Sequence, residues 1–148
     1  MVSNPNLDTL NDEPTATTSS NKVATNDRLV LALTLSNVPP ILQPLILIAV
    51  GKAGNEPVRP HHFYRITTED LIATGVSKSS VHDVFAYANE NLMKQVIELR
   101  NKLDDGSEEL VRMPWVAGMR YFDKLDYCEL EFNDTISKFI STLLKTSI

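Results

Sequence analysis

Apolar side chains recur at helical spacing through the middle of the chain. After Ser77, apolar residues follow at i, i+3, i+4, i+7 and i+11, which places them on one face of a helix. They are Val81, Val84, Phe85, Ala88 and Leu92. A shorter helix is expected just before, capped by Thr67 or Thr68 and ended by Gly75, which adopts positive φ without steric cost. Helix, glycine-containing turn, helix and strand pair is the order of a winged helix-turn-helix.

Two strands are expected after this helix pair. Residues 96–101 are expected to pair with residues 109–122 through a turn that contains Asp105 and Gly106, a favourable hairpin combination. Pro114 cannot donate a ladder hydrogen bond, so the second strand is expected to have an edge or a bulge there.

Two further segments alternate between side-chain types with a period of two, which predicts half-buried strands. Residues 62–67 place Tyr64 and Ile66 on one face and Phe63 and Arg65 on the other. In residues 127–133 the side expected to be buried carries Cys128, Leu130 and Phe132. The side expected to face solvent carries Tyr127, Glu129 and Glu131. A turn at residues 123–126 precedes this strand.

Helices are expected at both ends of the domain. Residues 27–36 are almost uninterrupted aliphatic and fit either a helix or a buried strand, and residues 29–35 are aggregation-prone when exposed. Residues 41–54 predict a buried helix; if it starts at Pro40, Pro44 falls within or just past its first turn. A final helix is capped by Asn133 or Asp134, and its core face carries Ile136, Phe139, Ile140, Leu143 and Leu144. The pattern predicts an α+β winged helix with extra N-terminal and C-terminal helices.

Composition limits the domain organisation. The chain of 148 residues is 43% hydrophobic and 22% charged, which suits one globular core. Residues 1–26 are rich in Ser, Thr, Asn and Asp and are expected to form a disordered tail, so the winged-helix domain is expected to span residues 27–148. Cys128 has no partner for an internal disulfide, and no segment has the pattern of a membrane span or a signal peptide. These features predict a cytoplasmic protein.

Three stretches carry a resemblance to a known family. They are NDRLVLALTLS leading into the aliphatic ILIAV, then YRITTEDL, and the closing MRYFDKLDYCELEFNDTISKFISTLL. From about Asn26 to the C-terminus, their order and spacing resemble the amino-terminal winged-helix domain of iteron-binding plasmid replication initiators. The resemblance implies a bacterial protein of two tandem winged helices, of which this chain spans the first. It also implies that this domain joins two copies in an autorepressing dimer and contacts double-stranded DNA, largely the backbone, in the active monomer.

The candidate DNA contacts lie on the second helix and on the hairpin, which are the parts of a winged helix that touch DNA. On the helix they are Lys78, Ser79, Ser80 and His82. On the hairpin they are Arg100, Lys102 and Arg112. Asp83 and Glu90 on the same helix face repel a polyanion, and a net charge of −5 argues against binding by charge alone. We therefore expect weak contact with the DNA backbone.

The expected function is a dimerisation and regulatory module of a replication initiator, with DNA contact secondary and host replication proteins as possible partners. A freestanding winged-helix repressor that reads an operator is the alternative, and a small metal-dependent enzyme is a remote one. Adjacent His61 and His62 do not present two nitrogens to one metal, and His82 joins them only through tertiary structure. Cys128 falls on a buried strand position. We therefore expect no catalytic residue, no metal and no cofactor.

Overall fold

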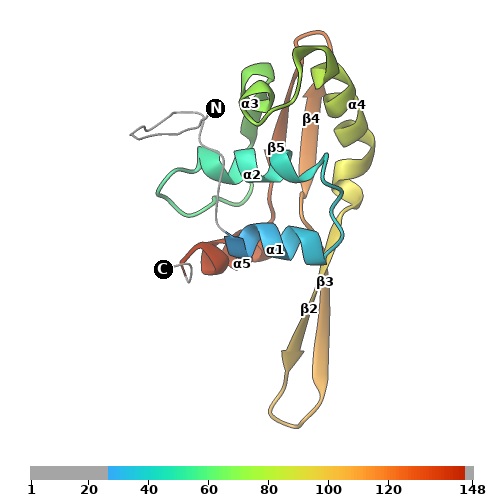
Figure 1. Ribbon diagram of the computed structural model, residues 1–148. Helices are drawn as coiled ribbons and strands as arrows, with labels where there is room; N and C mark the ends of the chain where they lie inside the picture. The colour runs from blue at the N-terminus through green and yellow to red at the C-terminus, as the bar shows by residue number, and fades with distance from the viewer. Residues whose placement is uncertain (1–26, 146–148) are drawn as a thin grey trace.

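The described residues form two separate antiparallel sheets (Figure 1). The structure, a computed structural model, describes residues 27–145, so the expected tail at residues 1–26 lies outside the described part. The helices are α1 (Asp27–Leu35), α2 (Gln43–Lys52), α3 (Thr68–Ala73), α4 (Val81–Asn91) and α5 (Asp134–Lys145), with 3-10 turns η1 (Lys78–Ser80) and η2 (Leu92–Lys94). The strands are β1 (Tyr64–Thr67), β2 (Val96–Lys102), β3 (Glu108–Pro114), β4 (Gly118–Phe122) and β5 (Tyr127–Glu131).

The three-stranded sheet, in the order β1-β5-β4, belongs to the winged helix. Strand β1 leads directly into α3 and α4, and the β4–β5 hairpin later returns to the same sheet with β5 beside β1. The turn of this hairpin lies beside the start of α4 (Figure 1). We call the β4–β5 hairpin the wing. The predicted α+β winged helix is confirmed, and α1 and α5 are its extra helices.

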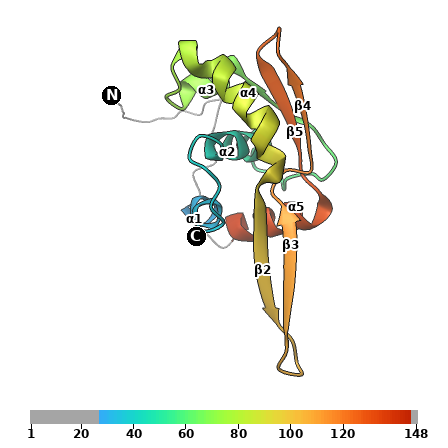
Figure 2. The ribbon, with the colours of Figure 1, turned by 90° about the vertical axis from the view of Figure 1, so that its right-hand side faces the viewer.

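The first hairpin along the sequence lies outside this sheet. Strands β2 and β3 form a two-stranded ribbon, inserted between α4 and the wing, that projects away from the helices (Figures 1 and 2). The prediction that residues 109–122 form one strand of the hairpin is wrong past Pro114, where β3 ends. Residues 118–122 instead form β4 and pair with β5.

The chain changes sheets within three residues after the ribbon. The Trp115 backbone N–H donates to the Gln95 carbonyl at 2.9 Å, which closes the base of the ribbon. The Ala117 N–H then donates to the Glu131 carbonyl at 2.7 Å, which starts the wing. The Trp115 side chain is fully buried, and its Nε1 donates to Ser36 Oγ at 2.9 Å. A buried tryptophan with a satisfied N–H therefore fixes the junction between ribbon and wing.

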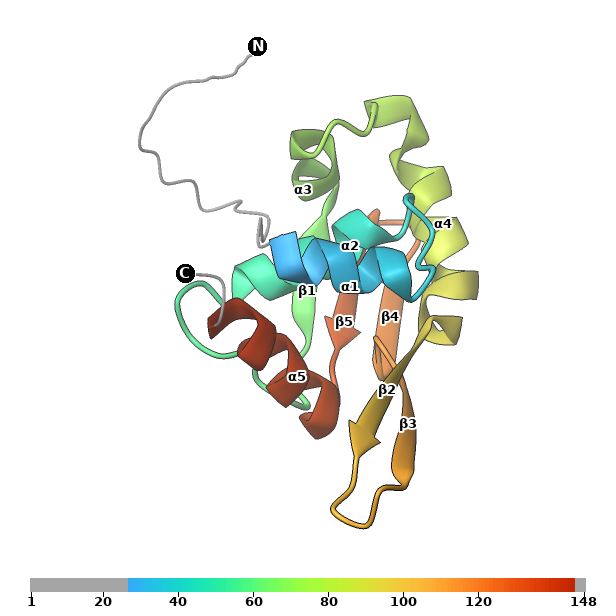
Figure 3. The same ribbon diagram turned by 60° about the horizontal axis from the view of Figure 1, so that its bottom comes forward.

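The helices cover one face of the three-stranded sheet (Figure 2). Helix α2 packs against β1 and α4 against β4, while α1 and α5 lie together beyond the end of the sheet (Figure 3). The largest buried side chains are Trp115, Phe85 and Phe132. Within residues 27–145, the structure has no helix of the length and apolarity that a bilayer crossing requires.

The first aliphatic segment is a helix, which settles the choice that periodicity left open. In α1, Leu29 and Leu33 are fully buried, whereas Leu31 and Leu35 are 55% and 72% exposed. Leu29 and Leu33, at i and i+4, therefore contact the core, and Leu31 and Leu35, each two residues further on, face solvent.

Helix α2 begins later than the sequence suggested. It starts at Gln43 rather than Pro40, because the Leu42 N–H donates to the Pro39 carbonyl at 2.9 Å in a separate turn. Pro44 is therefore the second residue of the helix, where an N–H has no partner within the helix. The helix is buried on most sides, as predicted.

The predicted core faces of α4 and α5 are confirmed. In α4 and η2 the buried positions include Val81, Val84, Phe85, Ala88 and Leu92. In α5, Ile136 and Ile140 are buried, and Phe139, Leu143 and Leu144 pack against the core. Asn133 caps α5, because its Oδ1 accepts the Ile136 N–H at 2.7 Å.

The alternation predicted for β5 fails at one residue. Glu129 was expected to face solvent, but only 8% of it is exposed. Arg65 of β1 and Arg120 of β4 lie opposite it in register, and their guanidinium nitrogens lie 3.0 and 2.7 Å from its carboxylate oxygens. Arg65 also stacks on the Tyr127 ring, and Arg120 on the Phe63 ring. Arginines from both neighbouring strands therefore cover this carboxylate on the outer face of the sheet.

Candidate nucleic-acid interface

Side-chain hydrogen bonds fix the start of α3 and thereby the geometry of the helix pair. Thr67 Oγ1 accepts the Asp70 N–H at 3.1 Å, and Asp70 Oδ2 accepts the Thr67 N–H at 2.9 Å. This reciprocal pair satisfies donors that the first helical turn leaves free. Lys52 at the end of α2 forms an ion pair with the same buried carboxylate at 2.9 Å. At the other end of α3, Gly75 turns the chain toward α4 with φ of +104°.

Exposed polar residues precede α4. Lys78, Ser79 and Ser80 form the turn η1, and all three are exposed. Ser77 Oγ donates to Ser80 Oγ at 2.9 Å and lies 3.4 Å from Ser79 Oγ, and neither Ser77 nor Ser80 caps a helix through its side chain. The hydroxyl groups and the ammonium therefore lie at the positive end of the α4 dipole, where a phosphate group is favoured.

His82, one turn further along, is tied to the wing. Its Nδ1 lies 3.0 Å from Asp126 Oδ1 and 3.3 Å from the Tyr121 hydroxyl. The hydrogen bond to Asp126 raises the pKa of His82 above 6.5, and the charges of Asp126, Asp83 and Asp123 act in the same direction. Partial burial raises the pKa of Tyr121, so its hydroxyl stays protonated. The start of α4 and the wing therefore form one polar surface.

The turn of the wing, residues 123–126, adds a cation that the sequence reasoning missed. Lys124 is exposed in this turn. Asp126 has a left-handed backbone (φ +50°), and its carbonyl accepts the Thr68 hydroxyl at 2.8 Å, which fixes the turn against α3. Lys124 was missed because the wing was assigned to the first hairpin; the turn itself was predicted. We call Lys78, Ser79, Ser80, His82 and Lys124 the α4–wing surface.

The structure does not bring Arg100, Lys102 and Arg112 to this surface. They lie on the ribbon, at the opposite end of the molecule (Figure 1). Arg100 lies 3.6 Å from Glu108 and 4.0 Å from Glu98, and Arg112 lies 3.8 Å from Glu98. The guanidinium charges of Arg100 and Arg112 are therefore compensated by exposed ion pairs on the ribbon.

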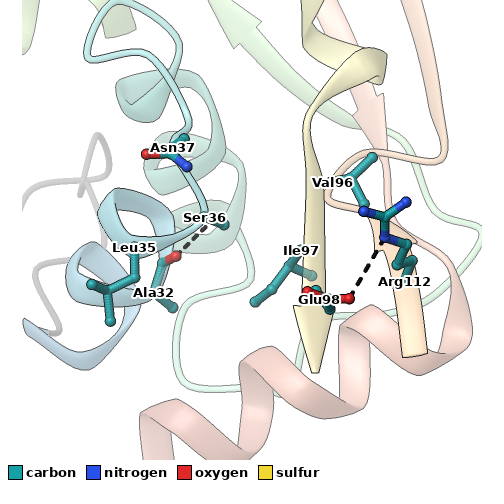
Figure 4. Close-up of a pocket in the computed structure, with 8 residues that line it drawn as sticks. All are labelled: Ala32, Leu35, Ser36, Asn37, Val96, Ile97, Glu98 and Arg112. Atoms are coloured by element: carbon teal, nitrogen blue, oxygen red, sulfur yellow. Dashed lines mark hydrogen bonds and ion pairs between the residues drawn. The ribbon is translucent and has the colours of Figure 1, made fainter. Parts of the chain in front are cut away.

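A groove of about 680 Å³ separates the end of α1 from the base of the ribbon (Figure 4). Ala32, Leu35, Ser36 and Asn37 line one side, and Val96, Ile97, Glu98 and Arg112 line the other. Leu35 and Val96 contribute exposed apolar side chains. The groove therefore combines apolar walls with an ion pair at its rim.

The histidines do not form a metal site. His61 Nδ1 lies 3.7 Å from Glu131, the His62 ring packs edge-on against Tyr64 with centroids 4.7 Å apart, and His82 contacts the wing. Across residues 27–145, no three His, Cys, Asp or Glu side chains converge as metal ligands. Burial raises the pKa of the Cys128 thiol to about 12, so it stays protonated and is a poor nucleophile.

A helix-turn-helix with an adjacent wing defines the class of winged-helix DNA-binding domains. The family described as initiator replication protein, WH1, matches residues 20–147, and the chain belongs to this family. Among solved structures, the chain is similar to the WH1 domain of MSBI1.176, a replication protein isolated from a multiple sclerosis patient. The TM-score is 0.62 at 18% identity, over 83% of this chain and 93% of that chain. A search of curated proteins finds no match. The resemblance to plasmid replication initiators is therefore confirmed.

Proposed function

We propose that this domain contacts the backbone of origin DNA through the α4–wing surface, without reading the base sequence. The observation that supports this proposal is the proximity of the start of α4 to the turn of the wing, which gathers exposed hydroxyls, two lysines and an imidazole at one end of the fold. Phosphate oxygens accept hydrogen bonds from the hydroxyls, from the lysine ammonium groups and from a protonated imidazole. The surface carries no arginine, and arginine is the commonest reader of guanine in the major groove.

We also propose that two copies associate as a homodimer in autoregulation, in the cytoplasm of a bacterium. Two features of the ribbon end support this. Among the described residues β2 pairs only with β3, so each strand has a free edge that can accept another strand. Leu103 and Leu110 near the tip of the ribbon are exposed, and the groove at its base offers apolar walls. Exposed apolar side chains and free strand edges along the same ribbon favour a protein partner.

The DNA contact is tested by fluorescence anisotropy with random duplex at several salt concentrations. Lys78→Ala with Lys124→Ala is expected to weaken binding and to reduce the slope of log affinity against log salt by about 1 per lysine. The matched control is Arg100→Ala with Lys102→Ala, which removes the same charge from the ribbon. Equal losses in both double variants would show that net charge, and not the α4–wing surface, governs binding.

Dimerisation is tested by sedimentation velocity over a range of protein concentrations. Leu110→Glu on the ribbon is expected to shift the protein from dimer to monomer, because a dimer would desolvate the introduced charge. Leu125→Glu is the control, since Leu125 is also an exposed leucine, 67% exposed against 53% for Leu110, and lies in the turn of the wing. A wild-type protein that remains monomeric at all concentrations, or a Leu110→Glu dimer, would overturn this assignment.

A further inference from the structure

The contact with the wing fixes the tautomer of His82. A carboxylate only accepts hydrogen bonds, so at 3.0 Å from Asp126 Oδ1 the His82 Nδ1 carries a hydrogen and donates it. The Tyr121 hydroxyl, 3.3 Å from the same nitrogen, is the more distant neighbour. The remaining ring nitrogen, Nε2, makes no hydrogen bond to any residue that the structure describes.

Protonation therefore changes what His82 offers to a ligand. With Nδ1 already carrying hydrogen, the neutral ring presents a lone pair at Nε2, which is an acceptor and cannot bond a phosphate oxygen. The imidazolium presents an N–H donor at the same atom and a full positive charge. The side chain is 60% exposed, so an approaching phosphate can reach it.

We propose that His82 is a proton-linked phosphate contact and that Asp126 is its positioning residue, so that DNA binding takes up a proton at Nε2. This inference rests on the proposed DNA contact at the α4–wing surface. The proton comes from solvent, and no covalent bond to the ligand forms.

The groups that face His82 favour the charged form. They are Asp126 and Asp123 in the turn of the wing, Asp83 on α4 and the neutral Tyr121 on β4. These carboxylates raise the pKa of His82, and its protonation in turn offsets negative charge that repels a phosphate. The left-handed backbone of Asp126 and its carbonyl bond to Thr68 hold the carboxylate in place against the ring.

The test is the DNA titration repeated at fixed ionic strength from about pH 5.5 to pH 8.5. Wild-type affinity is expected to fall as pH rises through the pKa of His82, by up to about tenfold per pH unit for one linked proton. His82→Gln is expected to lose this slope. His61→Gln removes a histidine that contacts Glu131 at the end of β5, away from the turn of the wing, and it should keep the wild-type slope.

Asp126→Asn separates the positioning of the His82 ring from the effect of the Asp126 charge. Asparagine tolerates the left-handed backbone, and its side-chain oxygen still accepts the Nδ1 hydrogen, but the carboxylate charge is lost. The pH dependence of binding is expected to move to lower pH in this variant. Asp123→Asn also removes one carboxylate charge, but Asp123 makes no hydrogen bond to His82, so this variant should move the pH dependence of binding less.

The outcomes distinguish the two proposals. Absence of DNA binding at every pH and salt concentration would overturn the DNA contact itself. Binding with the same pH slope in wild type and His82→Gln would overturn only the proton linkage. Asp126→Gly, which accepts the left-handed backbone but removes the bond to Nδ1, is expected to bind more weakly than Asp126→Asn, and equal binding by the two variants would overturn the positioning role. Thermal melts of each variant check that the fold is retained.

Discussion

The two ends of this molecule both carry basic residues, but their surroundings differ. On the ribbon, residues 96–114, three basic residues share the two strands and their turn with five acidic ones, and arginines pair with glutamates across the strands. At the α4–wing surface, Lys78 and Lys124 have no ion pair among the described residues, and the nearby hydroxyls face solvent. Both ends expose leucines, Leu103 and Leu110 on the ribbon and Leu125 in the turn of the wing, but the ribbon also has an apolar-walled groove at its base.

This difference makes a basic residue a better candidate for contact with nucleic acid where the fold leaves it without an ion pair. The same amino acids stabilise a hairpin when a glutamate lies opposite, and they remain available to a phosphate when none does. The ribbon therefore suits a protein partner, and the α4–wing surface suits a polyanion.

The largest expected change in stability comes from a substitution at the end of α4, the helix that connects the two ends of the molecule. Leu92 is fully buried where α4 runs into the ribbon, so Leu92→Asp is expected to cost about 4 kcal/mol or more and to unfold the domain. Leu125→Asp makes the same chemical change at a side chain that is 67% exposed, and should stay within about 0.5 kcal/mol of wild type. Chemical denaturation measures both. A cooperative, unchanged transition for Leu92→Asp would show that α4 packs by another face.

A smaller loss of stability should distinguish the buried ion pairs of Glu129 from the exposed ion pairs of the ribbon. Glu129→Gln leaves two arginines without their shared carboxylate at a buried position, and is expected to cost about 1–3 kcal/mol of unfolding free energy. Glu108→Gln removes the exposed ion pair with Arg100 on the ribbon and is expected to cost about 0.5 kcal/mol or less. Urea denaturation measures both variants. Equal losses of unfolding free energy would mean that the buried ion pairs stabilise the fold no more than the exposed ones.

The smallest effect is the pH dependence of stability at His82. Its folded-state pKa is raised above 6.5 by Asp126, so the stabilisation is fully present below pH 6.5 and is lost as pH rises through the folded pKa. The melting temperature of wild type should exceed that of His82→Gln at pH 6, and the gap should narrow at pH 8.5. A gap that widens toward high pH would contradict the ion pair.

Helix positions were predictable from the sequence because their signals are local. The apolar stripe of α4 recurs within a few turns, and Thr67 and Asp70 form their capping pair three residues apart. Such patterns depend on chain geometry that every helix shares.

Positions set by distant partners were not predictable in the same way. Glu129 is buried because Arg65, in a strand far earlier in the chain, lies beside it together with Arg120. Trp115 is apolar, which suits a strand as well as a buried crossing between sheets, so alternation did not reveal the break after Pro114. The assignment of the wing, and with it Lys124, depended on that break.

A hydrogen bond at the base of the ribbon brings its two ends together, so the ribbon can be removed as a unit. The Trp115 N–H lies 2.9 Å from the Gln95 carbonyl, so the chain enters and leaves the ribbon at nearly the same point. Excision of residues 96–114 and closure with a short glycine linker would leave the order of every helix and of the three-stranded sheet intact, at the expense of the buried Ile97 and Met113 side chains. The winged helix therefore has its own continuous chain path, and the ribbon is an insertion that can be removed from it.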